Sequence, residues 1–224
     1  MRQYFSSFFL LAFLASFLMA CEQEVYEKGD GAYSLLRADF VEAHVQADKT
    51  VDYFITDEGD RLNVATPFTP SWVETPDTFY RAACSYNNTG QTVEVISMGQ
   101  ISVIDSIIPA GKLENGVKTD PLSLESIWVS TNKRYLNIGL LLKIGTTDNA
   151  KAIHRVGLVA DTVITHDDGK RTMHARLYHD QGDVPEYYSH RTYFSVLQSC
   201  LDADSISLTT NTYDGKVVKR LFLK

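Results

Sequence analysis

Residues 135–144 read Tyr-Leu-Asn-Ile-Gly-Leu-Leu-Leu-Lys-Ile, and this stretch indicates the fold class. Its even-numbered residues, from Leu136 to Ile144, are all apolar, so they would line one face of an extended chain. A period of two predicts a β-strand, because successive side chains of a strand point to opposite faces. The other face includes Tyr135, Asn137 and Lys143, which suits a strand with one face in a core.

The residues around this strand repeat the same pattern. A strand over 153–165 is expected to turn at 166–170 and return over 172–179. Asp214-Gly215 predicts a hairpin between strands at 206–212 and 217–223, since Asp-Gly favours the tight turns of hairpins. Residues 195–201 are compatible with a single helical turn. Short strands separated by polar turns predict a β-sandwich over residues 122–224.

The N-terminal half also alternates with a period of two. Five strands are expected, at residues 36–45, 51–55, 62–64, 79–86 and 92–104. In the first of them the apolar positions change phase between Phe40 and Val41, which predicts a β-bulge. Five strands of which the first is long and bent suit an OB-like barrel, assigned to residues 32–108. A polar stretch with proline near both ends, residues 109–121, is the expected linker to the sandwich.

The first twenty residues have the pattern of a secretory signal. Arg2 is followed by an apolar run from Phe8 to Met19, which is shorter than the roughly 20 residues that span a bilayer. A small residue, Ala20, precedes Cys21, so residues 1–20 are predicted to be a lipoprotein signal peptide and Cys21 the lipid attachment site. Several acyl chains anchor a protein stably where one does not. Residues 21–31 are expected to form an acidic tether.

The charge of the chain limits its partners. Removal of residues 1–20 leaves 20 basic and 28 acidic side chains, a net charge of −8. Nucleic-acid binding depends on neutralising phosphates with Lys and Arg, so no nucleic-acid partner is expected. An acidic surface has no attraction for anionic lipid, so the membrane contact is assigned to the lipid on Cys21 alone.

Two further cysteines, Cys84 and Cys200, lie far apart in the sequence. Export would permit a disulfide between them. Free cysteine often behaves as a small core residue, so we favour two buried, independent thiols over a bridge.

The motifs of common enzyme classes are absent from the sequence. It contains no GxSxG, HExxH, GxxxxGK or GxGxxG pattern. His166, His174 and His179 lie on one predicted hairpin, but strand alternation separates the last two and argues against a metal site. The turn Asp57–Asp60 lacks the spaced oxygen ligands of a calcium loop. We therefore predict no catalytic residue, no metal and no cofactor, although a glycosidase needs only two suitably placed carboxylates.

Aromatic residues offer the remaining candidates for a binding site. One group contains Phe68 and Trp72, and another contains Tyr187, Tyr188, Tyr193 and Phe194. Such rings form platforms for sugars or peptides, or they pack in a core. Trp72 is the candidate ligand contact, because it lies in a Pro/Thr-rich loop rather than an alternating strand.

Taken with the lipobox-like end of the signal, three stretches carry a family resemblance: Tyr33–Phe40, Phe79–Tyr86 and Tyr135–Ile138. On these the whole chain resembles the NigD-like lipoproteins. The resemblance implies an OB-like domain followed by a β-sandwich, no known enzymatic activity, and a role in bacteriocin immunity inferred from gene position. It also implies a palmitate-bearing lipoprotein of the outer membrane, displayed at the cell surface. The triplets that begin at Asp105, Asp161 and Asp204 resemble O-glycosylation acceptors of the same group.

The sequence thus favours a non-catalytic, lipid-anchored envelope protein that binds a protein, peptide or glycan. The alternative is an envelope glycan hydrolase with an unrecognised carboxylate pair, for which a cleft with two facing acids would be required.

Overall fold

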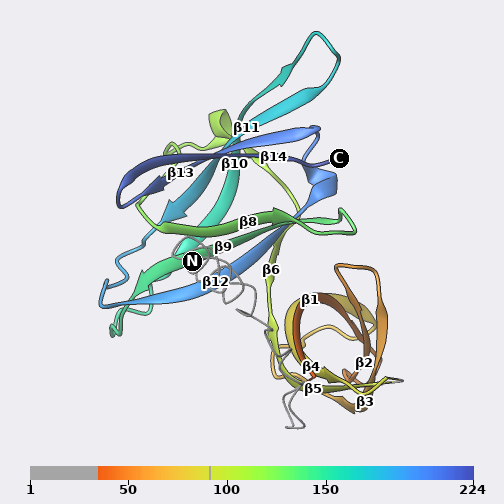
Figure 1. Cartoon of the computed structure of the whole chain (residues 1–224). Coiled ribbons are helices and arrows are strands. Elements are labelled where there is room, and N and C mark those ends of the chain that lie inside the picture. Colours follow the sequence, from red (N-terminus) through yellow and green to blue (C-terminus); the bar gives the residue numbers. More distant parts are fainter. Residues whose placement is uncertain (1–34, 91) are drawn as a thin grey trace, which may run out of the picture. The chain divides into compact units, whose positions relative to one another are not determined.

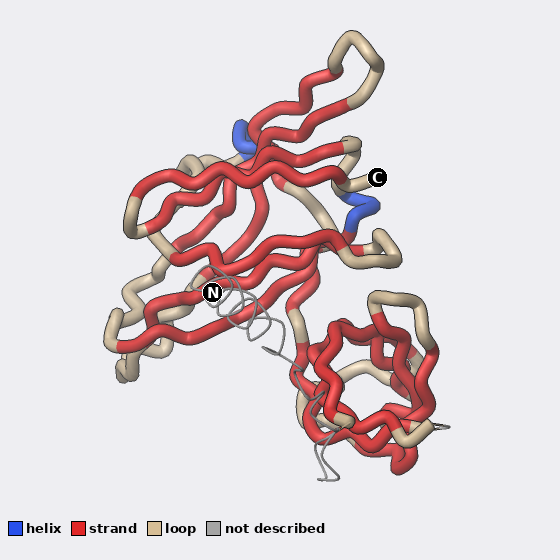
Figure 2. The backbone as a smooth tube through the Cα atoms, viewed as in Figure 1, coloured by secondary structure: helices blue, strands red, loops and turns tan. Residues whose placement is uncertain are grey.

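The computed structural model describes residues 35–90 and 92–224, and the signal, Cys21 and the tether lie outside these residues. One compact unit, Leu36–Lys224, contains all the strands. Its described elements are strands apart from two short 3-10 turns, η2 (Ala110–Lys112) and η3 (Gln198–Cys200) (Figure 2). In this part of the chain no helix has the length and apolar character needed to cross a membrane.

The first five strands close into a barrel, drawn in orange to yellow-green in Figure 1. The order around the barrel is β1-β2-β3-β5-β4, and β1 closes it by pairing with both β2 and β4. This confirms the predicted five-stranded OB-like barrel. The strands are β1 (Leu36–Val45), β2 (Val51–Thr56), β3 (Arg61–Phe68), β4 (Thr78–Asn88) and β5 (Val93–Gln100).

The interior of the barrel is filled by alternate residues of each strand. Val41, Ala43 and Val45 of β1 are fully buried there. The rings of Phe54 and Tyr86 meet at 5.1 Å, edge to face. Tightly packed apolar side chains of this kind supply most of the stability of a small barrel.

The predicted bulge between Phe40 and Val41 was wrong. The pairing of β1 with β4 is unbroken from Leu36 to Val45, and the only irregularity in β1 is in its pairing with β2, between His44 and Val45. The apolar pattern changes phase because Phe40 points out of the barrel, where its ring packs against Trp128 and Tyr193. An apolar residue that packs on the outer face of a strand changes the apolar pattern of the sequence in the same way as a bulge.

The remaining strands form two sheets, as predicted for a β-sandwich, coloured green to blue in Figure 1. The order of one sheet is β14-β13-β11-β10-β7, and that of the other is β6-β12-β9-β8. The five-stranded sheet contains β7 (Ile108–Pro109), β10 (Arg155–Thr165), β11 (Arg171–Asp180), β13 (Ser205–Thr212) and β14 (Gly215–Phe222). The four-stranded sheet contains β6 (Ser102–Ile104), β8 (Ser123–Val129), β9 (Tyr135–Ile144) and β12 (Tyr188–Leu197).

The sandwich core lies between the inner faces of these sheets. Leu136, Ile138 and Leu140 of β9 are fully buried, as their alternation predicted. Ile206 and Leu208 of β13 belong to the same buried cluster.

Several strands of the sandwich were not predicted. The expected strand over 92–104 is interrupted at Ile101, and its last residues, β6, pair with β12 in the four-stranded sheet. Strand β7, at the start of the expected linker, pairs with β10. Strand β8 was missed, and β12 extends to Leu197 where a helical turn was suggested, so only η3 is helical there.

Candidate functional site

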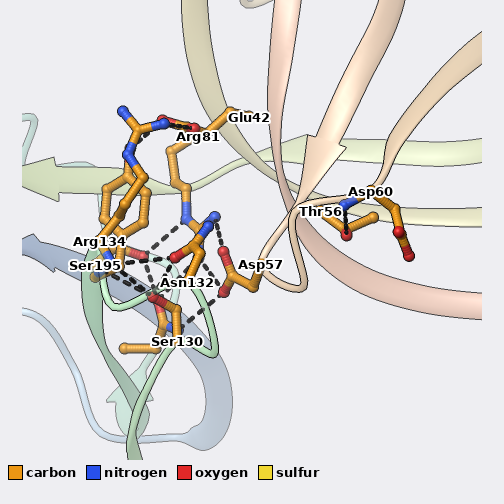
Figure 3. Close-up of polar contacts among 11 residues, drawn as sticks. Glu42, Thr56, Asp57, Asp60, Arg81, Ser130, Asn132, Arg134 and Ser195 are labelled. Carbon is orange, nitrogen blue, oxygen red and sulfur yellow. Dashed lines mark hydrogen bonds and ion pairs between the residues drawn. The ribbon is translucent and has the colours of Figure 1, made fainter.

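A cluster of buried polar side chains joins the barrel to the sandwich, and Figure 3 shows it. Its centre is Arg81 of β4, whose side chain is only 1% exposed. The two terminal nitrogens of Arg81 donate hydrogen bonds to the two carboxylate oxygens of Asp57, at 2.6 and 2.7 Å. A bidentate pair of this kind fixes the direction of the guanidinium as well as its charge.

The sandwich completes the environment of Arg81. Its Nε donates to Ser195 Oγ at 3.3 Å, and Nη2 also donates to Asn137 Oδ1 at 3.1 Å. Asn137 and Ser195 are paired neighbours on β9 and β12, and the Ser195 hydroxyl donates to Asn137 Oδ1 at 2.7 Å. Asn137 Nδ2 donates in turn to Asp57 at 3.3 Å, and the backbone N–H of Asn132 donates to the Asp57 carbonyl at 2.8 Å.

A second acid, Glu42 of β1, extends this junction. It is 5% exposed, accepts a hydrogen bond from Arg134, and accepts another from the Tyr135 hydroxyl at 2.7 Å. Burial, and then the bond to Glu42, raise the pKa of Tyr135 well above that of a free tyrosine. The Arg81 guanidinium lies 4.1 Å from the centre of the Tyr135 ring.

An aromatic group lies beside these charges. The Phe40 ring is 5.3 Å from that of Trp128 and 5.2 Å from that of Tyr193. Barrel and sandwich therefore share apolar and polar contacts. Because the carboxylates and the guanidinium of the junction are bonded to protein groups, we interpret it as a structural joint rather than a reaction centre.

A pair of histidines lies within the sandwich, with His179 buried and His154 half-buried. His154 Nδ1 and His179 Nε2 are 2.9 Å apart, within hydrogen-bond distance. The other nitrogens of these rings lie 3.0 Å from the Lys143 carbonyl oxygen and 2.9 Å from that of Asp120, respectively. Burial is the largest cause that lowers the pKa of His154, and the hydrogen bond to the Lys143 carbonyl opposes it. This chain of contacts connects the loop before β10 to the end of β11.

The outer face of the five-stranded sheet is the candidate binding surface. Strand pairing places polar and apolar side chains of four strands in two adjacent rows. The first row is Ile164, Thr172, Ser205 and Phe222, and the second is Thr162, His174, Ser207 and Arg220.

Two adjoining hollows lie on this outer face. One, of about 690 Å³, is bordered by the β10–β11 turn, and the other, of about 360 Å³, extends along β14. Both are lined by His166, Thr172, Ser205 and Phe222. The Phe222 ring is 82% exposed, the most of any large hydrophobic side chain in the described residues.

The polar groups of this surface suit recognition rather than catalysis. The Thr172 hydroxyl is 2.7 Å from His166 Nε2 and 2.9 Å from Ser205 Oγ. The threonine therefore separates the serine from the imidazole, and nucleophilic catalysis needs the two in direct contact. Hydroxyls and imidazoles beside an exposed aromatic ring are common in binding surfaces.

The structure places Trp72 on the barrel. Its indole is half-buried against the barrel core, and Nε1 donates to the Met98 carbonyl at 3.4 Å. Its ring packs edge to face against Tyr80, with centroids 5.5 Å apart. Trp72 remains a predicted ligand contact, with part of its surface already used in packing.

The other aromatic group is dispersed. Tyr187 and Tyr188 are 76% and 54% exposed, whereas Phe194 is buried in the sandwich core and Tyr193 packs at the junction. The predicted histidines are also separate: His179 is buried inside the sandwich, and His174 lies on its outer face.

Cys84 and Cys200 are both free, which confirms that they are independent thiols. Cys84 is 1% exposed, and burial raises its pKa to about 12. Cys200 is only half-buried, so its predicted burial holds in part. Of the acceptor-like triplets, Ser106 and Thr162 are exposed, and Ser205 is half-buried.

The arginine joint and the outer face were not found from the sequence. Arg81 and Ser195 are 114 residues apart and lie in no recognisable motif. The only local sign of the joint was the phase change at Phe40, and we assigned that to a bulge.

Comparisons with known proteins agree with this architecture. The family model described as "NigD-like C-terminal beta sandwich domain" matches residues 106–222. A solved NigD-like immunity protein from Bacteroides caccae is 26% identical, with a TM-score of 0.60 over 83% of this chain and 91% of that one. A protein of unknown function from Bacteroides vulgatus has the same TM-score at 14% identity, over 84% of this chain and 90% of that one, and shows the fold alone. No curated protein matches the chain significantly.

Proposed function

We propose that this chain, which belongs to the family with a NigD-like C-terminal β-sandwich domain, is a non-catalytic, lipid-anchored envelope protein that binds a protein partner. The proposal rests on a contrast between the polar side chains of the junction and those of the outer face. Those in the buried junction bind one another, whereas the outer face of the five-stranded sheet presents hydroxyls, imidazoles and the exposed Phe222 ring.

The family favours a protein as the partner. The Bacteroides caccae protein is named an immunity protein, and it is similar to this chain over nearly its whole length. The outer face supports a protein partner as well, because its hollows are shallow and combine a large exposed ring with hydroxyls. Peptides and glycans, which such a surface also suits, are alternative outcomes of the test.

Four aspartates have a lowered pKa, which argues against a role for them as the acid of a glycan hydrolase. Hydrogen bonds from neighbouring groups lower the pKa of Asp48, Asp180, Asp202 and Asp204. A glycosidase needs one carboxylic acid with a raised pKa to protonate the leaving group. These four acids are ionised at neutral pH and do not meet that requirement.

The location in the envelope rests on the sequence of the N-terminus. We propose that residues 1–20 are removed, that Cys21 carries the lipid, and that residues 21–31 hold the folded part away from the membrane. The further assignment to the outer membrane and the cell surface is part of the same proposal.

The anchor is tested by replacing Cys21→Ser and separating membrane from soluble fractions. We expect the wild-type chain in the membrane fraction and the variant in the soluble fraction, because the lipid on Cys21 is the proposed attachment and an acidic surface has no attraction for anionic lipid. Protein that stays in the membrane fraction after this change would overturn lipid anchoring.

The binding function is tested by crosslinking intact cells and isolating the wild-type protein. A specific protein partner is expected. Turnover of glycans or peptides by the purified chain would contradict the non-catalytic proposal, and capture of glycan alone would change the class of partner.

A further inference from the structure

Strand β14 forms a long, open edge of the five-stranded sheet. It has eight residues, Gly215–Phe222, and all of them pair with β13. Among the described residues no other strand pairs with β14, so its second side presents backbone N–H and C=O groups in a row. Such a row is a template for another strand.

The side chains of β14 are basic on an acidic protein. Lys216, Lys219 and Arg220 are exposed, and the described residues provide none of them with an ion-pair partner. By contrast, Arg171 and Arg176 of β11 are paired with aspartates. Because the chain has a net charge of −7, three unpaired cations in five residues form a local positive strip.

Lysines on an edge strand also have a simpler use, since they prevent edges from joining one another. That explanation requires an edge without exposed apolar groups. Here Val218 is 52% exposed and Phe222 82% exposed on the same strand. An edge protected only against association would not present an aromatic ring, so the mixture of charge and apolar surface points to a ligand.

Hollows lie on both sides of this strand. The outer one, of about 360 Å³, is lined on β14 by Arg220, Leu221 and Phe222. The other, of about 340 Å³, lies between β14 and β8 and is lined on the β8 side by Leu124, Ile127 and Glu125, whose carboxylate is paired with Arg191. Side chains of an added strand alternate between the two faces of a sheet, so those on one face would lie beside Val218 and Phe222 and those on the other beside the hollow next to β8.

We propose that β14 binds an extended, acidic segment of a partner protein as a sixth strand of the five-stranded sheet. The backbone edge supplies the main-chain hydrogen bonds, the basic strip selects acidic side chains, and the exposed Val218 and Phe222 contact apolar ones. This proposal rests on the proposed function, because it names the chemistry of the protein partner.

A direct test uses a labelled peptide of five Glu-Val repeats, with the mature chain carrying Cys21→Ser, and measures binding by fluorescence anisotropy. The alternating peptide is expected to bind. A peptide of the same composition with all its glutamates first, and one with N-methyl groups on every second residue, are each expected to bind about tenfold more weakly or worse. Equal binding of all three would show attraction of a polyanion only, and would overturn strand addition.

The protein side of the test reverses the charge of Lys216, Lys219 and Arg220 to glutamate together. We expect at least a roughly tenfold loss of affinity for the alternating peptide, since complementary charges select the partner and speed association. A matched control reverses three exposed lysines on other elements, Lys49, Lys112 and Lys151, and has the same net charge. The control is expected to keep most of the affinity, and an equal loss would assign the effect to net charge.

The same variants separate this inference from the proposed function. A partner captured in cells by the wild-type protein but not by the β14 variant supports both. Equal capture by the two proteins would leave the binding function in place and overturn the β14 site, and a wild-type protein that captures nothing would overturn the binding function itself.

Discussion

Two arginines in this molecule have opposite environments. Arg81 is 1% exposed and bound by Asp57, Asn137 and Ser195, whereas Arg220 is exposed on the open strand β14 and lines two hollows. A buried guanidinium has to be paired, because leaving water without a partner is costly. An exposed one remains available to a ligand. The difference separates the part of the protein that holds its two β structures together from the part suited to recognition.

The largest effect is expected at the buried arginine. Arg81→Met leaves the Asp57 carboxylate, whose side chain is 15% exposed, without its partner, and we expect a loss of about 3–5 kcal/mol in the free energy of unfolding. Denaturant unfolding measures this value. Arg176→Met is the matched control, since Arg176 binds Asp161 on the surface with side chains 35% and 33% exposed, and its loss should be about 0–1 kcal/mol.

Arg220→Met tests the exposed arginine of the comparison. This change should leave the unfolding free energy within about 0.5 kcal/mol of the wild type, as for most surface substitutions. If Arg81→Met cost no more than the two surface changes, the junction would not be a structural joint.

A smaller effect, which depends on pH, is expected at His154. Because burial lowers its pKa from the usual 6.5, the folded protein takes up this proton less readily than the unfolded chain. The contribution of His154 to stability is therefore present above pH 6.5 and is lost as the pH falls through the lowered pKa of the folded state. Unfolding of the wild type and His154→Gln at pH 7.5 and pH 5 should show a smaller loss in the variant. Identical losses of unfolding free energy in the wild type and the variant would contradict a lowered pKa of His154 in the folded state.

The smallest effect leaves stability unchanged and concerns the two thiols. The thiolate is the reactive form of cysteine, and burial raises the pKa of Cys84 to about 12. In the folded Cys21→Ser protein at pH 8, alkylation is expected at Cys200, which is half-buried, and not at Cys84. Variants Cys84→Ala and Cys200→Ala, each with one remaining thiol, identify the reacting residue. Modification of both at similar rates in the native state would show that the barrel opens readily.

Much of the fold could be predicted because strand alternation is local. Residues 136–144 reveal their buried face without reference to any other segment, and the closed barrel and the sandwich follow from counting such strands. Strands β8 and β12 were missed because their burial does not alternate: β8 has no fully buried residue, and the first four residues of β12 are all exposed. The candidate sites were harder to predict than the strands, because the residues of each site are far apart in the sequence.

The sequence by itself determined the all-β class and the order of a five-stranded barrel before a sandwich, and it favoured the two independent thiols that the structure shows. Only the tertiary structure decided which arginine is buried and which edge is open. Arg81 meets Ser195 across 114 residues, and β14 is an edge strand because none of the described strands other than β13 lies beside it. Alternation in the sequence indicates whether a side chain is buried. Which residue packs against it is decided by the packing of segments that are distant in the sequence.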